Sequence, residues 1–244
     1  MELNKIYNED CLIGMKKIPN ESVDAIITDP PYIIARENRF KTMGRYGIDF
    51  GEWDKEFDLI SWISLAIKKL KKGGNVVIFT DWKKISYIIE ELEKNNIEIK
   101  DLIRIEKSNP IPRNRDRRFI TDYEVAIYGV KKGSKWTFNR LSEKYERPLI
   151  KTAITPKSQK IGKGHPTQKP LYVMEWLVER LTQKGDVVLD PFMGSGTTAI
   201  ACINNNRRFI GFELDEYYCN LANERIEKHT KQIELFTLQE WQCE

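Results

Sequence analysis

Val23-Asp24-Ala25-Ile26-Ile27-Thr28-Asp29-Pro30-Pro31-Tyr32 decides the fold, because a short apolar run ends there abruptly in an acid, two prolines and an aromatic residue. A second segment has the same plan, with Val187-Val188-Leu189 leading into Asp190-Pro191-Phe192-Met193-Gly194-Ser195-Gly196-Thr197-Thr198. Continuous apolar runs of this length are typical of parallel strands covered on both faces. Open α/β sheets bind ligands beyond the carboxyl ends of such strands. We therefore predict that the two turns lie side by side and form one site.

The rest of the chain alternates between strand-like and helix-like segments. Strands are expected at 3–7, 23–28, 75–80, 99–106, 123–130, 187–189 and 209–212. Helices are expected at 12–18, 59–70, 82–94, 171–181, 197–205 and 215–229, the last capped by Asp215. Residues 33–56 lack a period and are expected to form a loop beside the site, while 230–244 is left unassigned. The alternation predicts an α/β fold, with a mostly parallel sheet and helices on both faces.

Composition limits the classes of protein. A chain of 244 residues with 41% hydrophobic content can bury the core of one domain. Four scattered cysteines and two histidines make a structural zinc site improbable. No run approaches the roughly 20 apolar residues that span a bilayer, so we expect a reduced, cytoplasmic protein with no membrane partner.

Charge is distributed unevenly. The net charge is only +4, but residues 131 to 169 hold 11 lysines and arginines against two acids, a local balance of +9, which leaves the remainder at −5. The arginine-rich segment 112–118 lies just before this stretch. Basic segments with interleaved aromatic residues are typical of nucleic-acid contacts, although a charge run is also often only a solvated surface.

The two turns offer complementary chemistry. The first supplies a carboxylate, a rigid proline pair and an aromatic face, and the second supplies glycines that allow a backbone to approach a bulky ligand. Each alone could be an ordinary strand-ending or helix-starting turn. The glycine segment lacks the Lys-Ser/Thr ending of a phosphate-binding loop, and Ala199 stands where a dinucleotide fingerprint would have its third glycine.

In this order, the D-P-P-Y segment and the glycine segment resemble the β group of DNA amino-methyltransferases, over residues 4–228. The resemblance implies S-adenosylmethionine as methyl donor, S-adenosylhomocysteine as product and no metal. It also implies a Rossmann-like methyltransferase sheet of about seven mostly parallel strands, one of them antiparallel, in a permuted order with a small inserted basic recognition region. The expected division is a D-P-P-Y half at 1–130, a target-recognition region at 131–164, a cofactor half at 165–229 and a tail at 230–244.

The resemblance assigns catalysis to Asp29, Pro30, Pro31 and Tyr32. The Asp29 carboxylate and the Pro30 carbonyl would accept the two hydrogens of an exocyclic amine, and Tyr32 would stack on the base. Because the amine is unreachable inside a duplex, the base must flip out. Attack would be in line without a covalent intermediate, since the Pro-Cys dipeptide of carbon-5 cytosine chemistry is absent from the sequence.

A larger set is expected at the cofactor. Glu213, at the tip of the next strand, is expected at the ribose hydroxyls, and Asp10 near the adenine unless it is only a helix cap. The segment from Thr167 is expected at the methionine end. The full set is Asp10, Cys11, Asp29, Thr167, Gln168, Lys169, Asp190, Pro191, Phe192, Gly194, Ser195, Gly196, Thr197, Glu213 and Leu214.

DNA, double-stranded or single-stranded, is the expected substrate. The residues expected to contact it are Arg113, Arg115, Arg117, Arg118, Lys135, Trp136 and Arg140. A homodimer and a cognate restriction endonuclease are further partner hypotheses.

The leading hypothesis is methylation of adenine N6 in a restriction-modification, phage or mobile-element setting. Cytosine N4 is the nearest alternative, although family members acting there more often have serine in place of Asp29. From other classes, a non-catalytic DNA-binding protein with a methyltransferase fold and a nucleotide-dependent oxidoreductase stay open.

Overall fold

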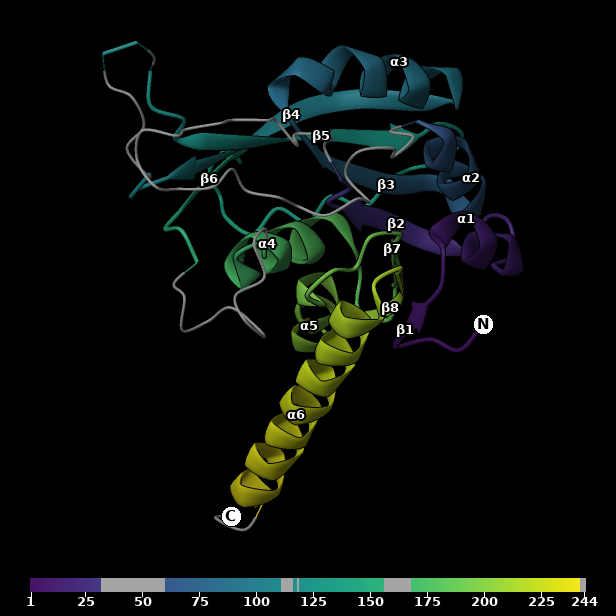
Figure 1. The fold of residues 1–244 in the computed structure, drawn as a ribbon, viewed down its shortest axis with the longest axis vertical. Helices are drawn as coiled ribbons and strands as arrows, with labels where there is room; N and C mark the ends of the chain where they lie inside the picture. The colour runs from purple at the N-terminus through teal and green to yellow at the C-terminus, as the bar shows by residue number, and fades with distance from the viewer. Residues whose placement is uncertain (32–59, 111–115, 118, 156–167, 242–244) are drawn as a thin grey trace, which may run out of the picture.

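The computed structural model describes residues 1–31, 60–110, 116–117, 119–155 and 168–241. Within them one sheet runs in the order β1-β8-β7-β2-β3-β5-β4-β6 (Figure 1). Its strands are β1 (Lys5–Asn8), β2 (Val23–Thr28), β3 (Leu70–Thr80), β4 (Ile97–Lys107), β5 (Tyr123–Lys131), β6 (Leu149–Thr152), β7 (Val187–Asp190) and β8 (Arg208–Glu213). The loop expected at 33–56 lies outside the described residues.

Strand direction confirms the expected sheet. β5 pairs antiparallel with both β3 and β4, and the other pairings in this sheet are parallel. An eighth strand, β6, comes from the basic segment 131–164 and pairs with β4 at one border of the sheet. Part of that segment is therefore built into the central sheet.

Helices cover both faces of the sheet (Figure 1). They are α1 (Cys11–Gly14), α2 (Ser61–Lys69), α3 (Ile85–Lys94), α4 (Leu171–Leu181), α5 (Thr197–Asn204) and α6 (Glu216–Trp241), with 3-10 helices η1 (Met15–Lys17) and η3 (Trp82–Lys84). Side chains of each central strand alternate between the two faces. In β2, Ile26 packs with α2 and α3, whereas Ala25 and Ile27 pack with α4 and α5. This two-sided burial explains why the strand reads as one apolar run.

The strand β3 begins earlier than expected. Gly73 and Gly74 were expected to lie between a helix that ends at 70 and a strand that starts at 75, but α2 ends at Lys69 and β3 already begins at Leu70. The glycines lie where the β2–β3 register shifts, with Gly73 at a φ of +76°, and a Cβ on Gly74 would lie 2.9 Å from the Asp24 carbonyl oxygen. They therefore form an irregularity inside the strand, where only glycine fits.

The last helix is longer than expected. α6 begins as predicted, since Asp215 Oδ1 accepts the Tyr218 amide hydrogen at 3.2 Å. It then continues to Trp241 through part of the unassigned tail and projects away from the sheet (Figure 1). Among the described residues, no helix is both long enough and apolar enough to cross a membrane.

The sheet has its topological switch point between β7 and β2. β2 pairs in parallel with β7 on one side and with β3 on the other. Ile26 faces Leu189 across the first pair, so the carboxyl ends of both strands lie side by side, as predicted. We call the border of the sheet formed by the carboxyl ends of its parallel strands the catalytic edge.

Gly14 permits a close contact that supports this edge. It lies at the end of α1 with helical φ and ψ, and a Cβ built there would lie 2.0 Å from Cε1 of the buried Phe212 ring on β8. Helix propensity alone predicts that Gly14→Ala would stabilise the protein. We expect instead a loss of about 1–3 kcal/mol from overpacking, measured by urea unfolding. A gain in stability would show that Phe212 yields without cost.

Candidate active site

A buried carboxylate joins the two turns. Asp190, at the end of β7, is only 2% exposed. Its Oδ1 accepts hydrogen bonds from Thr28 Oγ1 at 2.6 Å and from the Phe192 amide at 3.0 Å, and its Oδ2 accepts one from Thr198 Oγ1 at 2.6 Å. The end of β2, the end of β7 and the first turn of α5 are therefore held together by one side chain.

Burial raises the pKa of Asp190 to about 6, although its three hydrogen bonds favour the charged form and so oppose that rise. The nearby Asp29 charge adds to the rise. The carboxylate is therefore costly to keep ionised, and the hydrogen bonds recover part of that cost.

The glycine turn between β7 and α5 is fastened to β8. Gly194 and Gly196 have φ of 51° and 74°, in the left-handed region that favours glycine. The Gly194 amide donates to Glu213 Oε2 at 2.8 Å, while Glu213 Oε1 accepts the Asp215 amide hydrogen at 2.9 Å. Burial raises the pKa of Glu213. Since a carboxylate offers about four acceptor positions, Glu213 retains capacity for ligand hydroxyls, and the ribose role stays a prediction.

Residues from the first strand meet the tip of β8. Asn8 Nδ2 donates to the carbonyl oxygens of Glu213 and Leu214, both at 3.0 Å. Asp10, two residues further on, caps α1 by accepting the Leu12 amide hydrogen at 2.7 Å. Burial, aided by the Asp10 charge, raises the pKa of Cys11 to about 12, so its thiol is neutral. The structure thus brings Asp10 and Cys11 beside Glu213 and Leu214.

An arginine that the sequence patterns did not single out steadies the same turn. Arg225 on α6 donates through Nη1 to the Ser195 carbonyl oxygen at 2.8 Å and to Thr197 Oγ1 at 3.1 Å. Ser195 and Thr197 are buried beneath it. The sequence places Arg225 in the third turn of an expected helix but does not show which way that helix faces. No sequence pattern could therefore identify this contact.

Phe192 has an aromatic neighbour on α2. Its ring meets Trp62 edge to face, with centroids 5.0 Å apart and an interplanar angle of 83°. Trp62 is 1% exposed, and its Nε1 has no hydrogen-bond partner within the described part of the chain. The described members of the expected cofactor set lie at or just after the carboxyl ends of β1, β2, β7 and β8, at the start of α5 and in the segment before α4.

Asp29 lies next to the Thr28–Asp190 contact. Lys169 Nζ is 2.6 Å from Asp29 Oδ2 and 3.2 Å from Glu124 Oε2, and all three side chains are largely or partly buried. Lys169 was expected at the cofactor, and the structure ties it to the D-P-P-Y turn. Tyr32 and Thr167 lie outside the described residues.

Glu124 is a further residue that the sequence reading missed. β5 runs against its neighbours, so its beginning, not its end, reaches the catalytic edge. Had the antiparallel direction been assigned to the segment 123–130, the acid at its second position would have been a candidate.

The expected DNA contacts divide between opposite edges. Arg117 is exposed in the β4–β5 loop at the catalytic edge, and Arg113, Arg115 and Arg118 lie outside the described residues. Lys135, Trp136 and Arg140 follow the far end of β5, and at about 3.3 Å per residue that strand separates them from Glu124 by roughly 25 Å. The structure therefore does not bring these three residues to Asp29.

Two features of these regions were not visible in the sequence. Phe119, near Arg117, is 96% exposed. At the opposite edge, the Lys100 ammonium lies 4.0 Å from the centroid of the Trp136 ring, and Asn139 donates its side-chain amide to the carbonyl oxygens of Glu179 and Thr182. The segment around Trp136 is thus held against the body of the protein.

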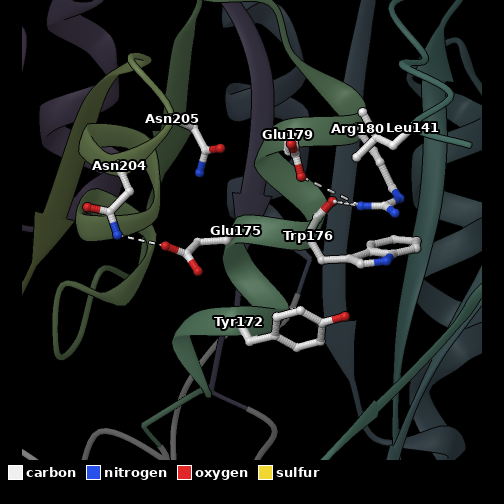
Figure 2. Close-up of a pocket in the computed structure, with 8 residues that line it drawn as sticks. All are labelled: Leu141, Tyr172, Glu175, Trp176, Glu179, Arg180, Asn204 and Asn205. Atoms are coloured by element: carbon white, nitrogen blue, oxygen red, sulfur yellow. Dashed lines mark hydrogen bonds and ion pairs between the residues drawn. The ribbon is translucent and has the colours of Figure 1, made fainter.

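A surface pocket on the outer side of α4 is separate from this site (Figure 2). Its lining is formed by Leu141, Tyr172, Glu175, Trp176, Glu179, Arg180, Asn204 and Asn205. Polar groups in it bind one another, with Asn204 Nδ2 donating to Glu175 Oε1 at 2.6 Å and Arg180 lying 4.3 Å from the Trp176 ring centroid. None of the expected catalytic or cofactor residues lines it. Among the described residues, no three His, Cys, Asp or Glu side chains gather as metal ligands would.

Comparison with known proteins agrees with this geometry. The model of the DNA methylase family of N6 and N4 amino-methyltransferases matches residues 23–224. The chain therefore belongs to this family, and the predicted membership among S-adenosylmethionine-dependent DNA amino-methyltransferases is confirmed.

Relatives match along nearly the whole chain. The Type II methyltransferase M2.DpnII of Streptococcus pneumoniae is 31% identical over 239 residues, covering 91% of this chain and 89% of the relative. M.HinfI of Haemophilus influenzae is 32% identical over 265 residues, covering 97% and 73%. The crystal structure of an M1.HpyAVI–SAM complex has a TM-score of 0.74 at 39% identity, covering 91% of this chain and 98% of that one. The cytosine-N4-specific PvuII methyltransferase shares the fold, with a TM-score of 0.72 at 18% identity over 93% and 89% of the chains.

The pKa of Asp190 gives a pH-dependent stability. Because the folded state binds this proton more tightly than the unfolded chain, the Asp190 contribution is most favourable below about pH 4 and falls as pH rises through about 6. We expect wild type to lose roughly 1–3 kcal/mol relative to Asp190→Asn between about pH 4.5 and pH 7.5, by urea unfolding. The constant cost of the substitution cancels in this difference. If the difference in unfolding free energy between wild type and Asp190→Asn were the same at both pH values, the Asp190 carboxyl group would not titrate in this range.

Proposed function

We propose that this protein transfers the methyl group of S-adenosylmethionine to the N6 amine of an adenine flipped out of DNA. The observation that carries the proposal is the contact between the D-P-P-Y turn and the glycine turn, made by the Thr28–Asp190 hydrogen bond. An acceptor for the amine and a turn suited to a bulky cofactor thereby share one edge of the sheet.

Asp29 is the acceptor in this proposal. Adenine's exocyclic amine is a poor nucleophile because its lone pair is delocalised into the ring. Hydrogen bonds from the amine to the Asp29 carboxylate and the Pro30 carbonyl favour a tetrahedral nitrogen whose lone pair can attack. Bound S-adenosylmethionine supplies an electrophilic methyl group. Lys169 keeps the Asp29 carboxylate in place through its 2.6 Å contact.

The remaining roles follow from position. Glu213 and Leu214, with Asp10 and Cys11 beside them, are assigned to the nucleoside end of the cofactor, where carboxylates suit hydroxyl and amine donors. Gln168, just before Lys169, is assigned to the methionine end. Asp190 is assigned to shaping the turn, because its oxygens already accept three hydrogen bonds from the protein.

Asp29 also favours adenine over cytosine. The shared fold of the cytosine-N4-specific PvuII enzyme leaves both bases open. The aspartate tilts the choice, because N4-acting members of the family more often have serine there. The Type II methyltransferases among the relatives support a restriction-modification role, in which a cognate endonuclease, a homodimer and a cytoplasmic location are part of the same proposal.

Asp29→Ala tests the catalytic assignment. With labelled S-adenosylmethionine and duplex DNA, we expect wild type to yield N6-methyladenine and the variant to lose at least about a thousandfold in rate, because the amine loses its acceptor. Cofactor affinity, measured by calorimetry, should change little. N4-methylcytosine in the nucleoside digest would replace the proposed base, and unchanged incorporation by Asp29→Ala would refute the role of Asp29.

DNA is proposed to approach the catalytic edge along the β4–β5 loop. Arg117 offers a phosphate contact there, and Phe119 is a nearly fully exposed aromatic ring that can stack on a base. Lys135 and Arg140 are exposed on the opposite edge, beyond the far end of β5, so they are not assigned to the DNA whose target base reaches Asp29.

The two edges can be compared directly. We expect Phe119→Ala to weaken DNA binding about tenfold, and Arg117→Ala to weaken it and reduce the slope of log K against log salt by about 1. The double variant Lys135→Ala, Arg140→Ala should bind DNA within about twofold of wild type. Fluorescence anisotropy with labelled duplex checks all three. Strong loss in the double variant alone would place DNA on the other edge.

A further inference from the structure

A chain of alternating charges leads away from the proposed catalytic aspartate. Lys169 Nζ lies 2.6 Å from Asp29 Oδ2 and 3.2 Å from Glu124 Oε2, and Lys107 Nζ lies 2.6 Å from Glu124 Oε1. These residues come from the end of β2, the segment before α4, the start of β5 and the end of β4. Four distant parts of the sequence therefore converge on one line of contacts at the catalytic edge.

The ionisation of Lys169 and of Glu124 depends on the charges beside them. The Lys169 side chain is 11% exposed and those of Asp29 and Glu124 are 19% and 31% exposed. Lys169 chiefly, together with Lys107, lowers the pKa of Glu124 to about 2 against the effect of burial. Burial would lower the pKa of Lys169, but Asp29 and Glu124 outweigh it and raise that pKa. Both groups thus stay ionised at neutral pH.

Glu124 shares with Asp29 the electrostatic attraction of the Lys169 ammonium. A buried ammonium beside a single carboxylate would pair with that carboxylate alone, and a carboxylate in such a pair is a weaker acceptor for an incoming amine. With Glu124 on its other side, Lys169 is held between two carboxylates. Phe79, whose ring centroid lies 5.0 Å from Lys169 Nζ, flanks the same ammonium.

We propose that Glu124 is a positioning residue for methyl transfer: it fixes Lys169 so that Asp29 is both held in place and left basic enough to accept the amine hydrogens. Glu124 acts through Lys169 and does not itself contact the base. This inference rests on the proposed role of Asp29.

Glu124→Gln removes the charge and keeps the shape. We expect the rate of the methyl-transfer step in single turnover to fall about ten- to hundredfold, as for other small misplacements of reacting groups. The dissociation constant for S-adenosylmethionine should stay within about threefold of wild type. Flipping, followed by the fluorescence of 2-aminopurine at the target position, should also be retained. A loss caused only by disturbed folding would lower all three readouts together.

Glu124→Asp is the conservative variant. It keeps the charge, and the flexible Lys169 side chain can follow the shorter arm, so we expect most of the rate to return. Equal losses in the Asp and Gln variants would overturn a role for the charge of Glu124. If Glu124→Gln does not fold, a rate for Glu124→Asp within about threefold of wild type still supports the proposal, and a hundredfold loss overturns it.

Glu106→Gln provides a matched control. Glu106 lies on the neighbouring strand with a side-chain exposure of 32%, against 31% for Glu124, and pairs with Lys151 at 3.3 Å and Arg104 at 3.8 Å. Among the described residues, the ion pairs of Lys151 and Arg104 include neither Asp29 nor Lys169. The single-turnover rate should therefore be unchanged. A loss equal to that of Glu124→Gln would show that any charge change at this border slows the enzyme, and would overturn the inference.

Asp29→Asn completes the series and separates the two proposals. An inactive Asp29→Asn with a fully active Glu124→Gln would refute the role of Glu124 alone. A fully active Asp29→Asn would refute the proposed role of Asp29, and with it the role of Glu124, whereas a wild-type protein that yields no N6-methyladenine would refute the proposed function itself.

Discussion

Burial of the Asp190 carboxylate at the switch point is the constraint on which the rest of the site depends. A charged group that is 2% exposed needs compensation, and it receives hydrogen bonds from the end of β2, from its own turn and from the first turn of α5. The geometry that satisfies one carboxylate therefore also fixes the separation between the D-P-P-Y turn and the glycine turn. The packing of helices on both faces excludes the water that would otherwise loosen these bonds.

Two further side chains hold the glycine turn in place. Glu213 fastens the glycine turn to β8, and Arg225 fastens it to α6. Side chains that bind backbone atoms leave the turn little freedom, so a cofactor would meet a surface that is already shaped. Preorganisation of this kind lowers the entropy that must be lost on binding and in the transition state.

Sequence patterns predicted the central sheet well because its strands are buried on both faces and leave continuous apolar runs, as in Val23–Thr28 and Val187–Asp190. The helix Leu171–Leu181 was found from spacing alone. The start of β3 was predicted wrongly because glycine is used both at helix ends and at strand irregularities, and Gly73 belongs to the second kind. The adjacency of the D-P-P-Y turn and the glycine turn was predictable, because both follow strands that are buried on both faces. Glu124 and Arg225 were not, because their contacts depend on strand direction and helix placement, and neither property leaves a local mark in the sequence.

Placement of Lys135 and Trp136 at the opposite edge has the same cause, the reversal of β5. That reversal makes β4 and β5 a hairpin whose loop contains Arg117 and Phe119 and whose first inward acid is Glu124. Phe119 lies five residues before Glu124, and Glu124 pairs with Ile105 in the ladder of the hairpin. The surface proposed to meet DNA and the charge proposed to position Lys169 therefore belong to one supersecondary unit, and a substitution in one is expected to affect the other.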